Sequence, residues 1–216
     1  MLNTHFKYIA IEGPIGVGKT SLARRLADTY DCDLVLEEPQ DNPFLERFYQ
    51  DRQSNALATQ LHFLFQRSRQ CQQMRQADMF DPVRVSDFML DKDQLFAQLT
   101  LDNEEYKLYE LVYERLAIDA PQPDLVIYLQ ATVDTLLKRI ATRGIEYEQT
   151  IESTYLRDLS DLYTRFFHQY DRGPLLIVNT EEADFVNSDH DYDQLLEQLQ
   201  GLTSGRRYFN AFKPES

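Results

Sequence analysis

Short apolar segments alternate with longer amphipathic segments along most of the chain. The apolar segments show no regular polar alternation, which is the pattern of parallel strands covered on both faces. They are YIAIE at 8–12, LVLE at 34–37, VRVS at 83–86, LVIYL at 125–129 and LLIV at 175–178. The longer segments have helical spacing and span 21–29, 57–74, 104–116, 133–141 and 155–170. This order predicts an α/β fold with right-handed crossovers and a doubly wound parallel sheet.

The length of 216 residues fits one domain. We place this domain at residues 1–201, because the segment 202–216, LTSGRRYFNAFKPES, follows the last predicted helix and lacks periodicity. We expect this tail to be mobile or to lie across the surface.

The chain is strongly acidic, with 22 Lys and Arg against 36 Asp and Glu, a net charge of −14 and a pI near 4.6. Phosphate backbones and anionic lipids attract basic surfaces, so we expect neither nucleic acid nor a membrane as a partner. Cys32 and Cys71 are too few and too far apart for a disulfide framework or a zinc site. With no signal-peptide pattern and no apolar run of about 20 residues, we expect a soluble, cytoplasmic protein.

The segment GPIGVGKTS at 13–21 directly follows the first predicted strand and leads into a helix. It satisfies the phosphate-loop pattern G-x-x-x-x-G-K-[ST], in which backbone N–H groups surround a β-phosphate. Lys19 would reach the β- and γ-phosphates, and the Thr20 hydroxyl would bind Mg²⁺. A plain glycine-rich turn would explain neither of these two residues. We therefore predict nucleoside triphosphate binding by Gly13, Pro14, Ile15, Gly16, Val17, Gly18, Lys19, Thr20 and Ser21.

A phosphate loop identifies the ligand but not the reaction. A GTPase would carry N-K-x-D after a late strand, whereas the corresponding region here reads LLIVNTEEADF. An ATPase motor would usually carry an apolar run that ends in adjacent acids, within a larger chain. Neither class fits this sequence well.

Two acids end predicted strands at the carboxyl edge of the sheet, where doubly wound folds bind ligands. Glu37 could accept a proton from a hydroxyl that attacks the γ-phosphate, but a plain strand-ending acid before Pro39 is an equally good interpretation. For Asp87 the position at the end of the third strand favours an acid linked to the metal or supporting the base.

Paired polar residues occur on two predicted helices. Gln60 and Arg67 lie two turns apart on one face and could read a nucleobase, although residues of these types are more often solvated. Arg139 and Arg143 close the helix VDTLLKRIATRG, with Gly144 as its C-terminal cap. They complement the helix dipole, which is compatible with a lid that brings Arg143 over the triphosphate.

Taken in order, these motifs resemble the deoxynucleoside kinase family, most closely its bacterial deoxyguanosine and deoxyadenosine kinases. The resemblance covers nearly the whole chain and rests on IAIEGPIGVGKTSL, EEPQDNPFLERFY, the helix from Gln60 to Arg67, DLVIYLQA, KRIATRGIEYEQTIESTYL and NTEEADFV. It implies the P-loop kinase fold with five parallel strands, helices on both faces and a short lid at about 139–150. It also implies a homodimer and the ATP- and Mg²⁺-dependent phosphorylation of the 5′-hydroxyl of a deoxynucleoside, with a purine base, in nucleotide salvage.

The resemblance further implies roles for individual residues. Glu37 would be the general base, with Glu38 as its substitute, while Lys19 and Arg143 would stabilise charge and Thr20 and Asp87 would surround Mg²⁺. The residues implied to bind the nucleoside are Glu37, Tyr49, Gln60, Arg67, Asp87, Asp93 and Glu148. Tyr49 and Glu148 would hold the 3′-hydroxyl, and Gln60 the base edge. Beyond the phosphate loop, ATP would be bound by Arg139, Arg143, Asp184 and Phe185, with Arg139 and Phe185 on either side of the adenine.

Two positions depart from the family pattern. Phe88 follows Asp87 where many members carry an arginine, and Ile145 follows Gly144 where relatives often carry another arginine. Lys92 or Arg143 could compensate, but Lys92 is equally typical of a solvated surface.

Two alternative functions remain open from the sequence. A thymidylate-type nucleoside monophosphate kinase would need extra cations for the acceptor's own phosphate, which the acidic segment around Glu37 does not obviously supply. A degenerate regulatory subunit that binds nucleotide would explain Phe88 and Ile145. The presence of Lys19, Thr20, Glu37 and Asp87 weighs against it.

Overall fold

The sheet consists of six parallel strands in the order β2-β3-β1-β4-β5-β6. The computed structural model describes residues 6–76, 83–117 and 120–211. The strands are β1 (Tyr8–Glu12), β2 (Asp33–Val35), β3 (Arg84–Ser86), β4 (Leu125–Gln130), β5 (Leu175–Asn179) and β6 (Arg206–Asn210). All five predicted strands are present, which confirms the α/β fold with a parallel sheet.

The prediction of five strands is wrong, because β6 pairs with β5 along its whole length. This strand comes from the tail 202–216, of which residues 212–216 lie outside the described part. Its sequence RRYFN has a single buried side chain, Phe209, since an edge strand needs to cover little of the core. The apolar signal that identified the other strands is therefore nearly absent here.

The central strands β1 and β4 are almost entirely buried, as their uninterrupted apolar sequences predict. All five residues of β1 and the first five of β4 are buried, and Ile9 pairs with Val85 on one side and with Leu125 on the other. Because β1 lies between β3 and β4, the loop that follows β1 emerges at the middle of the carboxyl edge.

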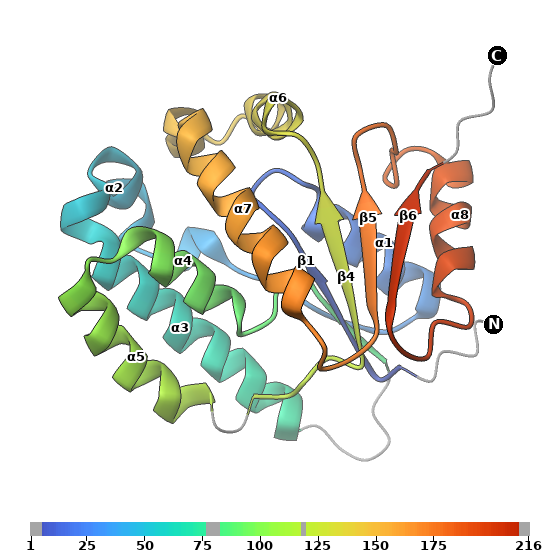
Figure 1. The fold of residues 1–216 in the computed structure, drawn as a ribbon, viewed down its shortest axis with the longest axis horizontal. Helices are drawn as coiled ribbons and strands as arrows, with labels where there is room; N and C mark the ends of the chain where they lie inside the picture. The colour runs from blue at the N-terminus through green and yellow to red at the C-terminus, as the bar shows by residue number, and fades with distance from the viewer. Residues whose placement is uncertain (1–5, 77–82, 118–119, 212–216) are drawn as a thin grey trace.

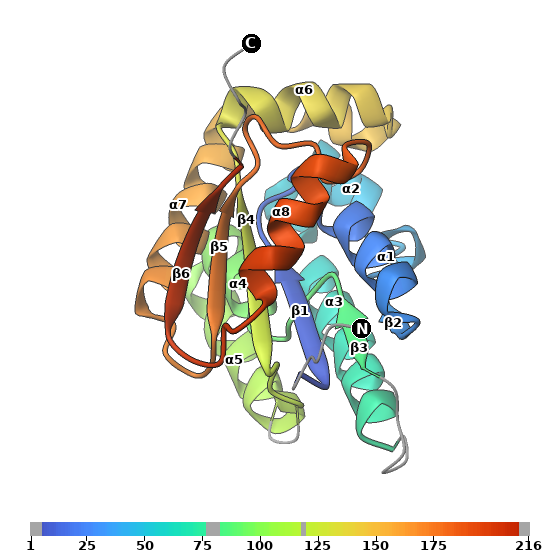
Figure 2. The same cartoon turned by 90° about the vertical axis from the view of Figure 1, so that its right-hand side faces the viewer.

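Helices cover both faces of the sheet. They are α1 (Lys19–Tyr30), α2 (Leu45–Gln50), α3 (Arg52–Gln76), α4 (Lys92–Thr100), α5 (Asn103–Ala117), α6 (Val133–Arg143), α7 (Ser153–Gln169) and α8 (Asp189–Leu199), with short 3₁₀ turns η1 (Pro39–Asp41) and η2 (Glu146–Thr150). Figures 1 and 2 show α1 and α8 on one face and α3, α4, α5 and α7 on the other. No helix in the described ranges has both the length and the apolar run of a membrane span.

Helix α6 lies across the carboxyl ends of the strands, at the top of Figure 2. The Thr132 side chain caps its N-terminus by accepting a hydrogen bond from the Thr135 N–H, and Gly144 ends it in the left-handed conformation with φ of 72°. The predicted cap at Gly144 is thus confirmed. This placement brings the end of α6 above the phosphate loop.

Candidate active site

The phosphate loop between β1 and α1 has a backbone that only glycine can adopt at its key positions. Gly13 has φ of +147°, and a Cβ there would lie 2.4 Å from the carbonyl oxygen of Leu129. Gly16 has φ of +83°, and its Cβ would lie 2.8 Å from a side-chain carbon of Ile140 on α6. The loop is therefore packed tightly between β4 and α6 while its open side remains available to a ligand.

Lys19, the first residue of α1, folds back over this loop. Its Nζ donates hydrogen bonds to the carbonyl oxygens of Gly13 at 2.8 Å and Pro14 at 3.2 Å. Burial, together with the positive charge of Lys92, lowers the pKa of Lys19 to about 8. An anion placed beside this ammonium would favour its charged form.

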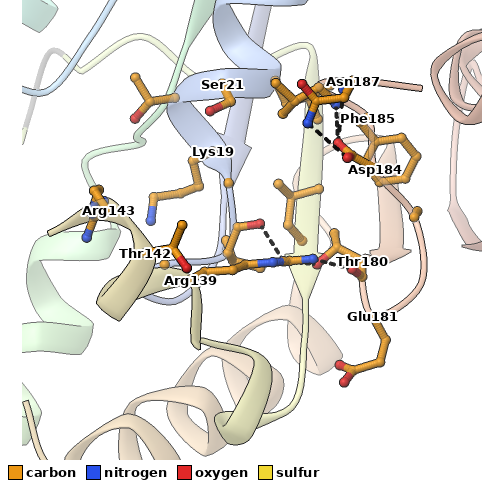
Figure 3. Close-up of a pocket in the computed structure, with 18 of the residues that line it drawn as sticks. Lys19, Ser21, Arg139, Thr142, Arg143, Thr180, Glu181, Asp184, Phe185 and Asn187 are labelled. Atoms are coloured by element: carbon orange, nitrogen blue, oxygen red, sulfur yellow. Dashed lines mark hydrogen bonds between the residues drawn. The ribbon is translucent and has the colours of Figure 1, made fainter. Parts of the chain in front are cut away.

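A cavity of about 800 Å³, here called the donor cavity, opens beside the loop (Figure 3). It is lined by residues 16–22, 129, 139, 142, 143 and 180–187. In Figure 3, Lys19 and Arg143 lie at one end, Asp184 and Phe185 at the other, and Arg139 extends between them. The four predicted ATP-binding residues outside the phosphate loop, Arg139, Arg143, Asp184 and Phe185, all line this cavity.

Arg139 is held in place by the loop after β5. Its guanidinium donates to the hydroxyl and carbonyl oxygens of Thr180, at 2.9 and 2.6 Å, and to the carbonyl oxygen of Val17 at 3.3 Å. The planar group is thereby fixed as one wall of the donor cavity, which suits stacking on a flat ring.

Asp184 organises the same loop from within. Its carboxylate accepts hydrogen bonds from the N–H groups of Val186 and Asn187 and from the Asn187 side chain. The Asn187 side-chain bond is the main cause of the lowered pKa of Asp184. These contacts fix the turn that carries Phe185, so Asp184 lines the cavity while its carboxylate bonds within the loop.

A smaller cavity of about 120 Å³, here called the acceptor cavity, lies on the other side of the phosphate loop. Its lining includes Ile15, Gly16, Lys19, Thr20, Glu37, Pro39, Leu45, Phe48, Tyr49, Thr59, Gln60, Phe63, Arg67, Asp87, Lys92, Phe96, Arg143, Glu148 and Tyr155. Gly16, Lys19, Thr20 and Arg143 line both cavities. A group transferred from one cavity to the other would pass these four residues.

Glu37 extends into the acceptor cavity between two cations. Arg67 donates to its Oε1, and Nζ of Lys92 donates to its Oε2 at 2.6 Å. Burial favours the neutral acid, but the charges of Arg67 and Lys92 outweigh it and lower the pKa of Glu37 to about 2. Glu38 does not line the cavity and is exposed to solvent, so Glu37 is the better placed of the two acids.

Asp87 joins the phosphate loop to the segment after β2, which carries Glu37. Its Oδ2 accepts a hydrogen bond from the Thr20 hydroxyl at 2.5 Å, and its Oδ1 accepts one from the Glu37 N–H at 2.8 Å. The two residues predicted to surround Mg²⁺ are therefore in contact, with hydroxyl and carboxylate oxygens of the kind that this ion prefers.

Arg67 lines the acceptor cavity and is paired with Asp93 beneath it. The Arg67 guanidinium bridges Glu37 and Asp93, and both Arg67 and Asp93 are buried. Burial raises the pKa of Asp93 to about 7, against the attraction of Arg67. Asp93 does not line the cavity, so it supports Arg67 from behind.

The remaining predicted nucleoside ligands lie around the cavity wall. The Gln60 side chain is buried and lines the cavity. Glu148 pairs with Arg143, and the ring of Tyr49 stacks on Tyr147 with centroids 5.7 Å apart. The structure thus gathers in one place six of the seven residues that we predicted to bind the nucleoside.

Two buried charged residues in or next to this site, Lys92 and Glu12, were not among the predicted site residues. Lys92 is 4% exposed and belongs to the acceptor cavity, although its sequence context resembles a solvated surface. Glu12 accepts hydrogen bonds from the N–H groups of Gly13 and Met89 and from the Tyr163 hydroxyl. Burial raises the pKa of Glu12. The sequence feature that could have identified Glu12 is its position as the acid that ends the otherwise apolar strand YIAIE.

Phe88, which departs from the family pattern, is fully buried in the core and lines neither cavity. Ile145 likewise lies outside both cavities. The cations that line the acceptor cavity come from other segments: they are Lys19 on α1, Arg67 on α3, Lys92 on α4 and Arg143 on α6.

The chain is also similar to known proteins in sequence and in fold. The chain is 32% identical over 203 residues to the deoxyguanosine kinase of Bacillus subtilis, covering 90% of this chain and 97% of the relative. It is 30% identical to the deoxyadenosine kinase of Lactobacillus acidophilus, with 88% and 94% covered. The solved structure of the deoxyadenosine kinase from M. mycoides with bound dATP superposes with a TM-score of 0.77 at 25% identity, over 89% of this chain and 98% of that one. Residues 9–204 match the family described as deoxynucleoside kinase, and the chain therefore belongs to the deoxynucleoside kinase family.

Proposed function

We propose that the protein transfers the γ-phosphate of ATP to the 5′-hydroxyl of a purine deoxynucleoside and produces the 5′-monophosphate and ADP for nucleotide salvage. The observation that carries this proposal is the position of Glu37, whose ion-paired carboxylate lies in the acceptor cavity close to the residues shared with the donor cavity. The family membership and the names of the relatives support a deoxynucleoside as the acceptor and do not favour the two alternatives.

In the proposed reaction the 5′-oxygen forms a bond with the γ-phosphorus, while the bond from this phosphorus to the β–γ bridging oxygen breaks. The hydroxyl proton passes to Glu37, and ADP leaves with the electron pair of the broken bond. A carboxylate with a pKa near 2 is a weak base, but it is fully ionised at neutral pH and fixed in position. Phosphoryl transfer depends mainly on positioning and electrostatics, so orientation of the hydroxyl is the larger contribution.

Lys19 and Arg143 would stabilise the charge on the transferring group. Both line the two cavities, and Lys19 already directs its ammonium to the carbonyl groups of the loop. Arg143 is the last residue of α6 and is held by Glu148 across the lid. Its several N–H donors allow it to keep Glu148 while another N–H reaches a phosphate oxygen.

Mg²⁺ would be held by the Thr20 hydroxyl and Asp87, with phosphate oxygens and water completing its coordination. When bound, it would neutralise charge on the β- and γ-phosphates. The hydrogen bond between Thr20 and Asp87 supports this use, because it brings a hydroxyl and a carboxylate oxygen together in the lining of the acceptor cavity.

A neutral acceptor fits the charges of the acceptor cavity. Arg67 is paired with Glu37 and Asp93, Lys92 with Glu37, and Arg143 with Glu148. An acceptor that carried its own phosphate would meet these carboxylates as well as the cations, which disfavours a nucleoside monophosphate. Gln60 would bond the base edge, and Tyr49 with Glu148 would hold the 3′-hydroxyl.

The proposal is tested by a coupled assay with ATP, Mg²⁺ and each of the four common deoxynucleosides and their monophosphates. We expect turnover on deoxyadenosine, deoxyguanosine or both. Absence of turnover on every nucleoside, with ATP binding intact, would refute the enzyme and favour a regulatory subunit. Turnover on a monophosphate alone would favour the thymidylate type.

A homodimer through α3 and α5 is also proposed. These two helices pack against each other, and they expose large apolar side chains, with Phe65 46%, Leu108 50% and Leu111 62% exposed. Light scattering of the purified protein should give twice the chain mass, and Leu111→Glu should give a monomer if this face is the interface. The free thiols of Cys32 and Cys71 are consistent with the cytoplasmic location that we propose.

A further inference from the structure

Lys92 is a buried cation beside the predicted base. It is the first residue of α4, is 4% exposed and lines the acceptor cavity. Its Nζ lies 2.6 Å from Oε2 of Glu37 and 5.5 Å from the ring centroid of Phe96. Burying an ammonium is costly unless a specific partner compensates for the lost water, so packing alone does not explain a lysine at this position.

Two cations hold the Glu37 carboxylate, one at each oxygen, and they differ in how many acids they bind. Arg67 binds Oε1 but also binds Asp93, so its position is shared between two acids. Lys92 binds Oε2 from a different helix. Each carboxylate oxygen keeps a further lone pair, which leaves room for a hydroxyl to donate to Glu37 without displacing either cation.

We propose that Lys92 is a positioning residue for the phosphoryl transfer, whose ammonium fixes the Glu37 carboxylate towards the acceptor hydroxyl. This inference rests on the proposed function, because it gives Lys92 a role that acts through the base. Lys92 also adds positive charge to the acceptor cavity on the side of α4, whereas Lys19 and Arg143 add it from α1 and α6. This arrangement supplies positive charge to the acceptor cavity without an arginine at position 88, where this chain has a phenylalanine.

The test compares Lys92→Met with Lys92→Arg in the coupled assay. We expect Lys92→Met to lower kcat by about 10²-fold, the loss typical when a catalytic group is misplaced by about an ångström. The KM for ATP should change less than about threefold, because Lys92 does not line the donor cavity. Lys92→Arg should recover at least about tenfold of the lost kcat, since it restores the charge.

Lys7→Met is a matched control, because Lys7 is exposed and precedes β1, at the end of the sheet opposite to the phosphate loop. We expect this variant to retain the kcat of the unmodified protein. It separates the loss of a particular ammonium from the general effect of replacing a lysine by methionine.

A double-mutant cycle tests whether Lys92 acts through Glu37. In a Glu37→Gln background, Lys92→Met should lower the remaining kcat by less than about threefold, because the group that it positions is already gone. A merely structural role would instead lower kcat by the same factor in both backgrounds.

The inference is overturned if Lys92→Met keeps kcat within about threefold, or if its loss is equally large without Glu37. Should Lys92→Met fail to fold, as judged by lost ATP binding, Lys92→Gln takes its place, and normal kcat of that variant overturns the role of the charge. If the unmodified protein phosphorylates no nucleoside, both the proposed function and this inference are overturned. If the unmodified protein is active and the Lys92 variant is equally active, only this inference is overturned.

Discussion

Replacing Glu37 by glutamine is the sharpest test of the proposed chemistry. The substitution keeps the shape of the side chain but removes the carboxylate that Arg67 and Lys92 hold in the acceptor cavity. Loss of a positioned general base typically lowers a rate by 10²- to 10⁴-fold, so we expect kcat to fall by about this factor. Binding of ATP should not change, because Glu37 does not line the donor cavity.

The same substitution should also reduce stability. The fall in the pKa of Glu37 from 4.5 to about 2 means that the folded protein favours the carboxylate by an amount on the order of 3 kcal/mol, since one pKa unit is about 1.4 kcal/mol. Glutamine cannot supply this attraction, and both cations lose an acidic partner. Urea unfolding at neutral pH should therefore show a loss of a few kcal/mol.

Glu38→Gln provides the matched control, because the neighbouring acid is exposed and lines neither cavity. Steady-state kinetics and ATP titration on both variants measure the two effects separately. If Glu37→Gln kept kcat within about threefold, or if Glu38→Gln showed the larger loss, Glu37 would not be the base.

Four further outcomes follow from the geometry. The stability difference between the unmodified protein and Glu37→Gln should be complete above about pH 4.5 and should disappear as the pH falls towards 2, because the depressed pKa stabilises only the ionised state. Urea unfolding at stepped pH measures this, and a constant difference would contradict it. Asp87→Asn should raise the Mg²⁺ concentration for half-maximal activity by about tenfold or more, because a carboxylate charge worth about 1.4 kcal/mol or more is lost. An unchanged Mg²⁺ titration would show that Asp87 does not bind the metal. Gln60→Leu should raise the KM for the nucleoside by about 10- to 100-fold and leave the KM for ATP nearly unchanged, because the buried edge of the base loses its hydrogen-bond partner. An equal rise in both KM values would argue against recognition of the base by Gln60. Phe88→Arg should destabilise the fold by several kcal/mol, because it places an unpaired charge in the core, and thermal unfolding near that of the unmodified protein would show that the side chain reaches solvent.

Contiguous features could be predicted from the sequence. The phosphate loop follows from nine consecutive residues, because local backbone geometry and the nearby lysine and threonine are sufficient for phosphate binding. Strands such as β1 and β4 were predicted within one residue at either end, because central strands must be apolar on both faces. The edge strand β6 was missed because partial exposure removes that requirement.

Lys92 shows why the site could not be completed from the sequence. In the segment LDKDQ it stands between two acids, which is typical of a solvated turn. In the fold, Asp93 turns inward to Arg67, while Lys92 reaches Glu37, a residue 55 positions earlier. Contacts of this length depend on how α3 and α4 pack against the sheet, and no local pattern encodes them.

The sequence by itself determined the alternation of strands and helices, the phosphate loop and the acids that follow β2 and β3. Each of these depends on neighbouring residues or on the carboxyl edge of a parallel sheet. Only the tertiary structure decided which acid enters the acceptor cavity, that Phe88 belongs to the core, and that Lys92 and Arg67 hold Glu37 together. The physical reason is that burial and ion pairing are set by segments that meet only after the sheet and helices have packed.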